Sequence, residues 1–176
     1  MTNLPVPTLP NEIPGNYIAS AVFNTVGLNG LGFALNPPCA ILQQATAQSI
    51  ATGLTLVPVT YDTESLDTYG GHSVTTNTSR YVGQVPGYYL VIGSVCYTAN
   101  ATGNRLIQIE KNGAAIGAQQ VFQSPTTSNS GTVQAAGIVQ LNGTTDYVEA
   151  YTVQTSGGSL TTVPANSSMY VVWIHA

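Results

Sequence analysis

The chain has 176 residues, enough for one domain with a genuine core and a short extension. Only 6% of its residues are charged, with three cations against seven acids and a formal net charge of -4. This composition argues against nucleic acid or an anionic membrane as a partner, because both require clustered Lys or Arg. A neutral surface rich in hydroxyl and amide groups instead favours packing against other protein copies.

Residues 1–38 are predicted to form an extended arm that precedes the folded domain. Four early prolines fix their own φ angles and push the residues before them out of the helical region. The start lacks a basic segment and does not resemble a signal peptide. A short helix is expected over residues 17–26. Gly27, Gly30 and Gly32 then disfavour a longer helix, and the Asn-Pro-Pro that follows closes the segment.

Residues 39–176 are predicted to form an all-β domain, a sandwich or jelly roll of about eight to ten short strands. Runs rich in Val, Ile, Tyr and Thr alternate with clusters of Gly, Asn, Pro and Ser. Asn112-Gly113 indicates a tight hairpin turn, and further turns are expected at Asn142-Gly143 and Pro86-Gly87. The expected strands cover residues 40–45, 54–61, 80–84, 88–97, 105–111, 114–122, 132–141, 147–154 and 168–175.

Two of these strands, 88–97 and 169–175, carry apolar or aromatic side chains on both faces. One face of a sandwich strand covers the core, so the second needs another partner, most simply a second subunit. The residues expected at this subunit interface are Tyr88, Leu90, Tyr151, Met169, Val171 and Trp173.

The sequence contains one polar constellation with the potential to bind a metal, formed by Asp62, Glu64 and Asp67 with His72 nearby. Three carboxylates with neighbouring hydroxyl oxygens could hold Ca²⁺. The spacing matches no known calcium loop, which favours a turn whose Asp side chains bond backbone N–H groups. Zinc is disfavoured because His72 and His175 lie far apart and the cysteines show no paired ligand spacing.

Cys39 and Cys96 could form a disulfide, but reduced thiols are favoured in a chain without a secretion signal. Nothing predicts an enzyme or a cofactor, because the sequence contains no nucleophile elbow and no phosphate-binding glycine loop. Asp146 and Glu149 are candidates for a glycosidase pair by number alone, and they are expected to project to different faces.

Four tyrosines also allow an interpretation as a surface on which sugars stack. Cross-strand aromatic pairing explains them equally well, so the two interpretations stay open. The residues concerned are Tyr69, Tyr81, Tyr97 and Tyr151.

Four segments follow one another in a recognisable order. They are Pro-Gly-Tyr-Tyr-Leu at 86–90, a strand ending in Asn-Gly at 107–113, an Asp-x-Val strand within 141–150, and a hydrophobic last strand at 167–174. Their order and spacing resemble the C1q/TNF-like jelly roll. Members of that superfamily are compact homotrimers whose last strand lies near the trimer axis, so the resemblance implies a trimer.

A second resemblance rests on Asn-Pro-Pro at 36–38, the run 40–44, Tyr-Asp-x-Glu at 61–64, the stretch 67–72 and Ser-Arg-Tyr at 79–81. This combination is similar to small virion proteins of tailed phages that infect actinobacteria. Those proteins place a short anchoring N-terminus before a C1q-like head and serve as capsid decoration, head-fibre or minor tail proteins.

The resemblance implies a non-enzymatic capsid decoration protein on the virion exterior, assembled in the host cytoplasm. Its homotrimeric knobs would be anchored to the major capsid protein or other virion subunits. A minor tail protein that recognises host surface carbohydrate is the alternative; it is disfavoured because no repeats exist that could build a shaft. The anchor candidates are Leu4, Pro5, Val6, Pro7, Leu9, Pro10, Ile13, Tyr17 and Phe23.

Overall fold

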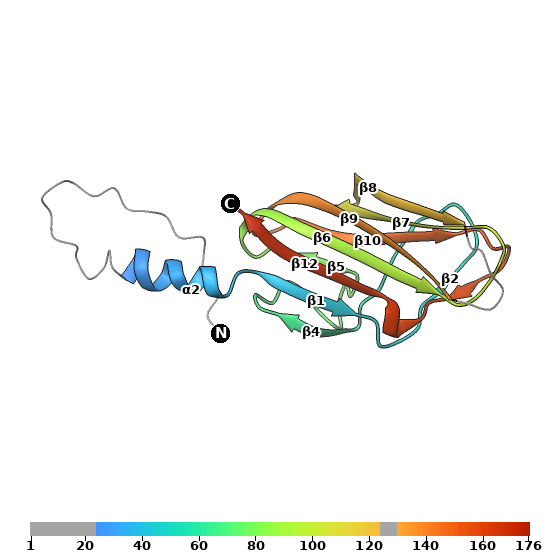
Figure 1. Ribbon diagram of the computed structural model, residues 1–176, viewed down its shortest axis with the longest axis horizontal. Helices are drawn as coiled ribbons and strands as arrows, with labels where there is room; N and C mark the ends of the chain where they lie inside the picture. Colours follow the sequence, from blue (N-terminus) through green and yellow to red (C-terminus); the bar gives the residue numbers. More distant parts are fainter. Residues whose placement is uncertain (1–23, 124–129) are drawn as a thin grey trace, which may run out of the picture.

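The computed structural model describes residues 24–123 and 130–176, and two antiparallel sheets packed face to face dominate it (Figure 1). Sheet 1 has the strand order β4-β1-β12-β6-β9, and sheet 2 has the order β3-β10-β7-β8, with β5 also paired to β10. The strands of sheet 1 are β4 (Thr63–Asp67), β1 (Cys39–Gln43), β12 (Ser168–His175), β6 (Pro86–Tyr97) and β9 (Gly131–Asn142). Those of sheet 2 are β3 (Val57–Pro58), β10 (Tyr147–Gln154), β7 (Asn104–Lys111), β8 (Ala114–Gln123) and β5 (Arg80–Val82).

A third, two-stranded sheet pairs β11 (Leu160–Thr161) with β2 (Ser49–Ile50), and the 3-10 turn η2 (Pro164–Asn166) leads into β12. The predicted all-β class is confirmed. The predicted strand at 54–61 shrinks to the two residues of β3, and β4 forms where a turn was expected. The segment that forms β4, Thr-Glu-Ser-Leu-Asp, has only one apolar residue and therefore no alternating pattern typical of a strand. It is a strand because it pairs with β1.

Two of the three predicted turns are confirmed, whereas the turn expected at Pro86-Gly87 was wrong, because both residues pair with β9 as the start of β6. Asn112 and Gly113 both have positive φ, 51° and 78°, which a type I′ hairpin requires between β7 and β8. At the turn between β9 and β10, the Asn142 side-chain oxygen accepts hydrogen bonds from the backbone N–H groups of Thr144, Thr145 and Asp146.

The core lies between the two sheets, and strand alternation supplies it. Ile107 and Ile109 of β7 are fully buried, whereas Leu106 and Gln108 face outward, as the sequence predicted. The two layers come very close at Gly93 of β6. A Cβ atom added there would lie 2.8 Å from the Cβ atom of Ala150, in the opposite sheet. The larger members of this core include Leu42, Tyr61, Tyr81, Tyr89, Val91, Tyr97, Leu141, Val148, Met169 and Val171.

Before β1, the chain forms a π-helical segment η1 (Asn24–Asn29) and a short helix α2 (Gly30–Leu35). The prediction that glycines would stop a helix here was wrong, because Gly30 and Gly32 lie inside α2. Packing outweighs their low helix propensity, since Phe33 is buried against the sandwich. The prediction that Asn-Pro-Pro closes the segment is confirmed, because the Asn36 N–H caps the last turn by bonding two helix carbonyls.

Helix α2 projects from the end of the sandwich beside the C-terminus (Figure 1). Most of the helix predicted over 17–26 and all the anchor candidates fall outside the described residues. Within the described ranges, no helix has the length and apolar character needed to cross a membrane. Both cysteines are free thiols, with Cys96 buried and Cys39 partly exposed.

Candidate functional site

The outer face of sheet 1 presents large apolar side chains to solvent in the described part of the chain. Strand register places Ile41, Tyr170, Ile92 and Ala136 side by side in one row across four strands. The adjacent row contains Cys39, Val172, Leu90 and Ile138. Neither row includes Asp, Glu, Lys or Arg. We call this surface the apolar face, composed of Ile41, Leu66, Tyr88, Leu90, Ile92, Ala136, Ile138, Tyr170, Val172 and Ile174.

Several members of the apolar face are strongly exposed. Ile138 has 61% of its surface accessible, and Tyr88 and Tyr170 each have 40%. Large apolar side chains that line up across neighbouring strands form a continuous patch, unlike isolated exposed residues, which need no explanation. The apolar face therefore has the chemistry of a contact surface.

The structure corrects the predicted interface residues in part. Met169 and Val171 point into the core and are fully buried, so they have no surface to offer a second subunit. The sequence predicted that both faces of strand β12 are apolar but gave no signal for which face points into the core. The residues on its outward face are Tyr170, Val172 and Ile174. Tyr88 and Leu90 do lie on the apolar face.

The two remaining interface candidates lie elsewhere. The Trp173 indole N–H donates to the Pro86 carbonyl at 3.2 Å, and its ring meets Phe33 edge-on with centroids 4.9 Å apart. Tyr151 belongs to the outer face of sheet 2, where its hydroxyl donates to Glu149 at 3.1 Å. Burial raises the pKa of Tyr151 to about 12, and the Glu149 charge adds to this.

The three acidic residues proposed as calcium ligands serve separate structural bonds. Asp62 accepts the N–H groups of Ala45 and Thr46 at 2.6 and 3.0 Å. Burial raises the pKa of Asp62, but hydrogen bonds from Thr46 and Ala45 outweigh it and hold this pKa below its ordinary value. Asp67 accepts N–H groups from three residues of the following turn, as the turn interpretation predicted.

Glu64, the third acid, pairs with His72. Its Oε2 atom lies 2.9 Å from His72 Nδ1, and the other ring nitrogen of His72 lies 3.1 Å from the Thr78 carbonyl. Among the residues that the structure describes, no three Asp, Glu, His or Cys side chains gather as a metal site.

The two carboxylates weighed as a glycosidase pair are both engaged in structural bonds. Glu149 is 1% exposed and accepts hydrogen bonds from Ser79 at 2.6 Å and from Arg80 at 3.1 Å, besides that from Tyr151. Asp146 lies in the turn before β10, where Lys111 Nζ approaches its Oδ2 atom to 2.8 Å. Hydrogen bonds from Lys111 and Asn112 hold the pKa of Asp146 below its ordinary value.

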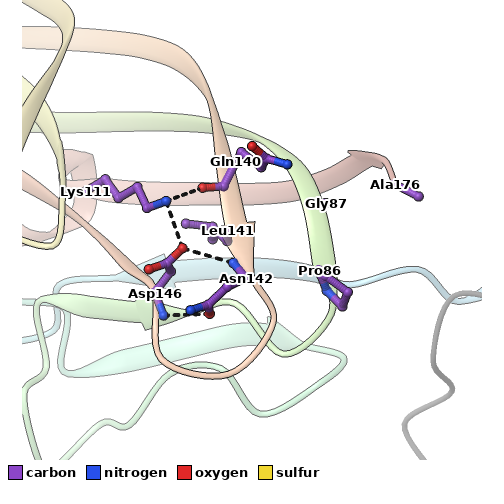
Figure 2. A pocket seen from close by; sticks show the side chains of 8 residues that line it. All are labelled: Pro86, Gly87, Lys111, Gln140, Leu141, Asn142, Asp146 and Ala176. Carbon is purple, nitrogen blue, oxygen red and sulfur yellow. Dashed lines mark hydrogen bonds and ion pairs between the residues drawn. The ribbon is translucent and has the colours of Figure 1, made fainter.

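Lys111 and Asp146 line a hollow of about 360 Å³ beside the start of β6 and the C-terminus (Figure 2). The Lys111 ammonium also donates to the Gln140 carbonyl at 2.7 Å, and Asp146 accepts the Asn142 N–H at 3.0 Å. Since these charged groups satisfy one another, the hollow offers little free hydrogen-bonding capacity for a ligand.

The interpretation of the four tyrosines as a sugar-stacking surface was wrong. Tyr69, Tyr81 and Tyr97 are at most 3% exposed, because their rings fill the core and its margin. Only Tyr151 retains some accessible surface.

Comparison with protein-family models gives no match, and comparison with curated proteins gives none either. Solved structures do match. Two crystal structures of murine APRIL align with TM-score 0.54 at 14% and 15% identity, covering 78% of this chain and 98% of theirs. The fold is a TNF-like jelly roll. A structure of Eiger TNF from S. frugiperda aligns with TM-score 0.48 at 12% identity, covering 78% of this chain and 92% of that one. At such identities the likeness extends to the fold alone.

Proposed function

We propose that this chain is a non-enzymatic structural protein that assembles as a homotrimer through the apolar face. One observation carries the proposal: two uncharged cross-strand rows present large apolar side chains to solvent. Each square ångström of apolar surface removed from water contributes about 25 cal/mol, so burying a patch of this kind between copies is strongly favourable. The sequence resemblance to trimeric C1q/TNF-like domains supports the same assembly.

We further propose that the trimer decorates the exterior of a phage capsid, held by residues 1–38. This part rests on the resemblance of the sequence to phage virion proteins. The composition of the arm supports it, because no charged residue occurs between Glu12 and Asp62. In the described part of the arm, Leu28, Leu31 and Leu35 are 59%, 58% and 76% exposed, as expected of a segment that contacts another protein.

Light scattering after size-exclusion chromatography tests the trimer. We expect the full chain to have three times the monomer mass at micromolar concentration. Ile138→Lys places three cations on the shared apolar face and is expected to yield monomers. Val121→Lys is the matched control, because Val121 is similarly exposed, at 56%, but lies on β8 of the other sheet. A monomeric wild-type chain would sink the proposal, as would an Ile138→Lys variant that remains trimeric.

Imaging of assembled particles tests the location. Density for three-fold knobs on the capsid shell would support decoration. Knobs on the tail tip, together with loss of adsorption when they are removed, would replace it with the receptor-binding alternative.

A further inference from the structure

A second hollow, of about 480 Å³, lies where three segments of the chain meet. They are the loop 70–77 that follows β4, the strand β5 with the residues after it, and the turn between β9 and β10. Half of its described lining consists of Ser, Thr, Asn and Gln side chains, and this lining contains no Asp or Glu, in a chain whose net charge is -4. This volume lies within the range of small-molecule sites.

Arg80 supplies the cation of this hollow and is held in one orientation. Its Nε atom donates to Glu149 at 3.1 Å, and its guanidinium carbon lies 4.1 Å from the centre of the Tyr147 ring. Among the described residues, its two terminal nitrogens, Nη1 and Nη2, have no hydrogen-bond partner, and its side chain is 36% exposed. A fixed guanidinium with two parallel free N–H donors suits a carboxylate, which accepts both.

The other two cations of the chain are already committed to partners. Lys111 is bound to Asp146 and to a backbone carbonyl. Arg105 is 1% exposed and donates to the carbonyls of residues 100, 102 and 104. Within the described ranges, the unused cationic hydrogen-bonding capacity is therefore concentrated at Arg80, in this hollow.

The segment of loop 70–77 that pairs with β5, beside Arg80, is also fixed before any ligand arrives. The His72 N–H donates to Asp67 at 2.9 Å, and both ring nitrogens of His72 are engaged by Glu64 and Thr78. Gly71 packs so tightly that an added Cβ would lie 2.5 Å from the Val82 carbonyl oxygen. A site with rigid walls loses little conformational entropy when it binds a ligand.

We propose that this hollow binds an acidic sugar. The sugar carboxylate accepts hydrogen bonds from Nη1 and Nη2 of Arg80, and its hydroxyls exchange hydrogen bonds with Ser73, Thr76 and Asn77 on one wall and Thr145 on the other. Side chains that both donate and accept match the alternating needs of a polyol. The site does not depend on the proposed trimer contact, because none of these residues belongs to the apolar face.

Calorimetric titration of the full chain with D-glucuronate, D-glucose and acetate tests the proposal. We expect glucuronate to bind with a millimolar Kd. Glucose lacks the carboxylate and acetate lacks the hydroxyl groups, so each should bind at least about tenfold more weakly. Arg80→Gln should lower the affinity for glucuronate about tenfold. Arg80→Lys should lower it less, because Lys keeps the positive charge although it cannot donate two parallel hydrogen bonds to the carboxylate. Thr161→Glu, at an exposed position of β11 outside the hollow, lowers the net charge by the same amount and is the control that should bind as the wild type does.

Thr145→Val provides a second variant that leaves the bonds between Arg80 and Glu149 in place, in case Arg80→Gln does not fold. It should weaken glucuronate binding several-fold without altering the weaker binding of acetate. Three results would overturn the proposal: no glucuronate binding by the wild type at millimolar concentration, unchanged binding in the folded Arg80→Gln or Thr145→Val variant, or equal affinity for acetate and glucuronate. The trimer proposal is tested independently, because light scattering measures the mass of the assembly and calorimetry measures sugar binding.

Discussion

At the scale of single residues, several charged side chains in the described part of the chain link segments that are far apart in the sequence. Lys111 and Asp146 connect the hairpin between β7 and β8 to the turn before β10. Glu149 gathers Ser79, Arg80 and Tyr151 around one buried carboxylate. Breaking such a buried cluster is costly, because each group left behind loses its partner.

The lowered pKa of Asp146 predicts a loss of stability in acid. A carboxylate whose pKa is lower in the folded chain stabilises the fold fully above its unfolded pKa of about 4, and this contribution is lost as the pH falls through the folded pKa. Asp62 adds to the effect in the same direction. We expect the free energy of unfolding, measured in urea, to fall as the pH is lowered from about 5 to about 3.

Asp146→Asn tests the assignment. It should cost about 1 to 2 kcal/mol at neutral pH, because hydrogen bonds from Lys111 and the Asn142 N–H lose a charged acceptor. Its stability should then vary less with pH below about 5 than that of the wild type. An unaltered pH profile in this variant would show that Asp146 contributes nothing to acid sensitivity.

At the scale of elements, α2 is joined to the sandwich through a small contact. Phe33, 5% exposed, packs in a cluster with Tyr69 and Val85 and meets the ring of Trp173. A six-residue helix has no independent stability in water, so this side chain decides whether α2 stays docked.

Phe33→Ala should release the helix without unfolding the sandwich. The loss of one buried aromatic ring corresponds to about 3 kcal/mol of docking free energy. Hydrogen exchange followed by mass spectrometry should then speed up over residues 24–36 and stay unchanged in β6 and β9. Leu35→Ala, at a side chain that is 76% exposed, is the matched control and should leave exchange as it is. Equal effects of the two substitutions would refute the role of Phe33.

The sequence predicted the β class and most strands, because period-two alternation and Asn-Gly turns are local signals. It failed where tertiary contacts decide. The strand β4 has one apolar residue and is recognised only by its partner, and α2 forms through glycines because of Phe33. Strand β12 is apolar on both sides, so the sequence could not tell that Met169 faces the core and Tyr170 faces solvent. Arg80 gave no signal, because the hollow around it joins residues about 75 positions apart in the chain.

At the scale of the whole molecule, the arm and the sandwich have separable roles under the proposed function. Deleting residues 1–35 should leave a folded trimer that no longer attaches to particles, because the core strands and the apolar face all lie after residue 38. Cosedimentation with particles that lack the protein measures attachment, and light scattering measures the trimer.

A shorter deletion, of residues 1–23, separates the first part of the arm from η1 and α2. Loss of attachment in both deletions assigns the anchor to residues 1–23, whereas attachment by the shorter deletion alone assigns it to the exposed leucines of residues 24–35. Normal attachment by both would refute the anchor.

The close approach of the two sheets at Gly93 limits where this protein can take on new activities. With the Ala150 methyl group and the Ile109 side chain pressed against the β6 backbone, the middle of the sandwich has no room for a lipophilic cargo. Selection can therefore change binding behaviour only at loops, edges and outer faces. The packed interior has to stay as it is. A display library built on this scaffold should therefore vary the 70–77 and 142–147 turns and leave Gly93 unchanged.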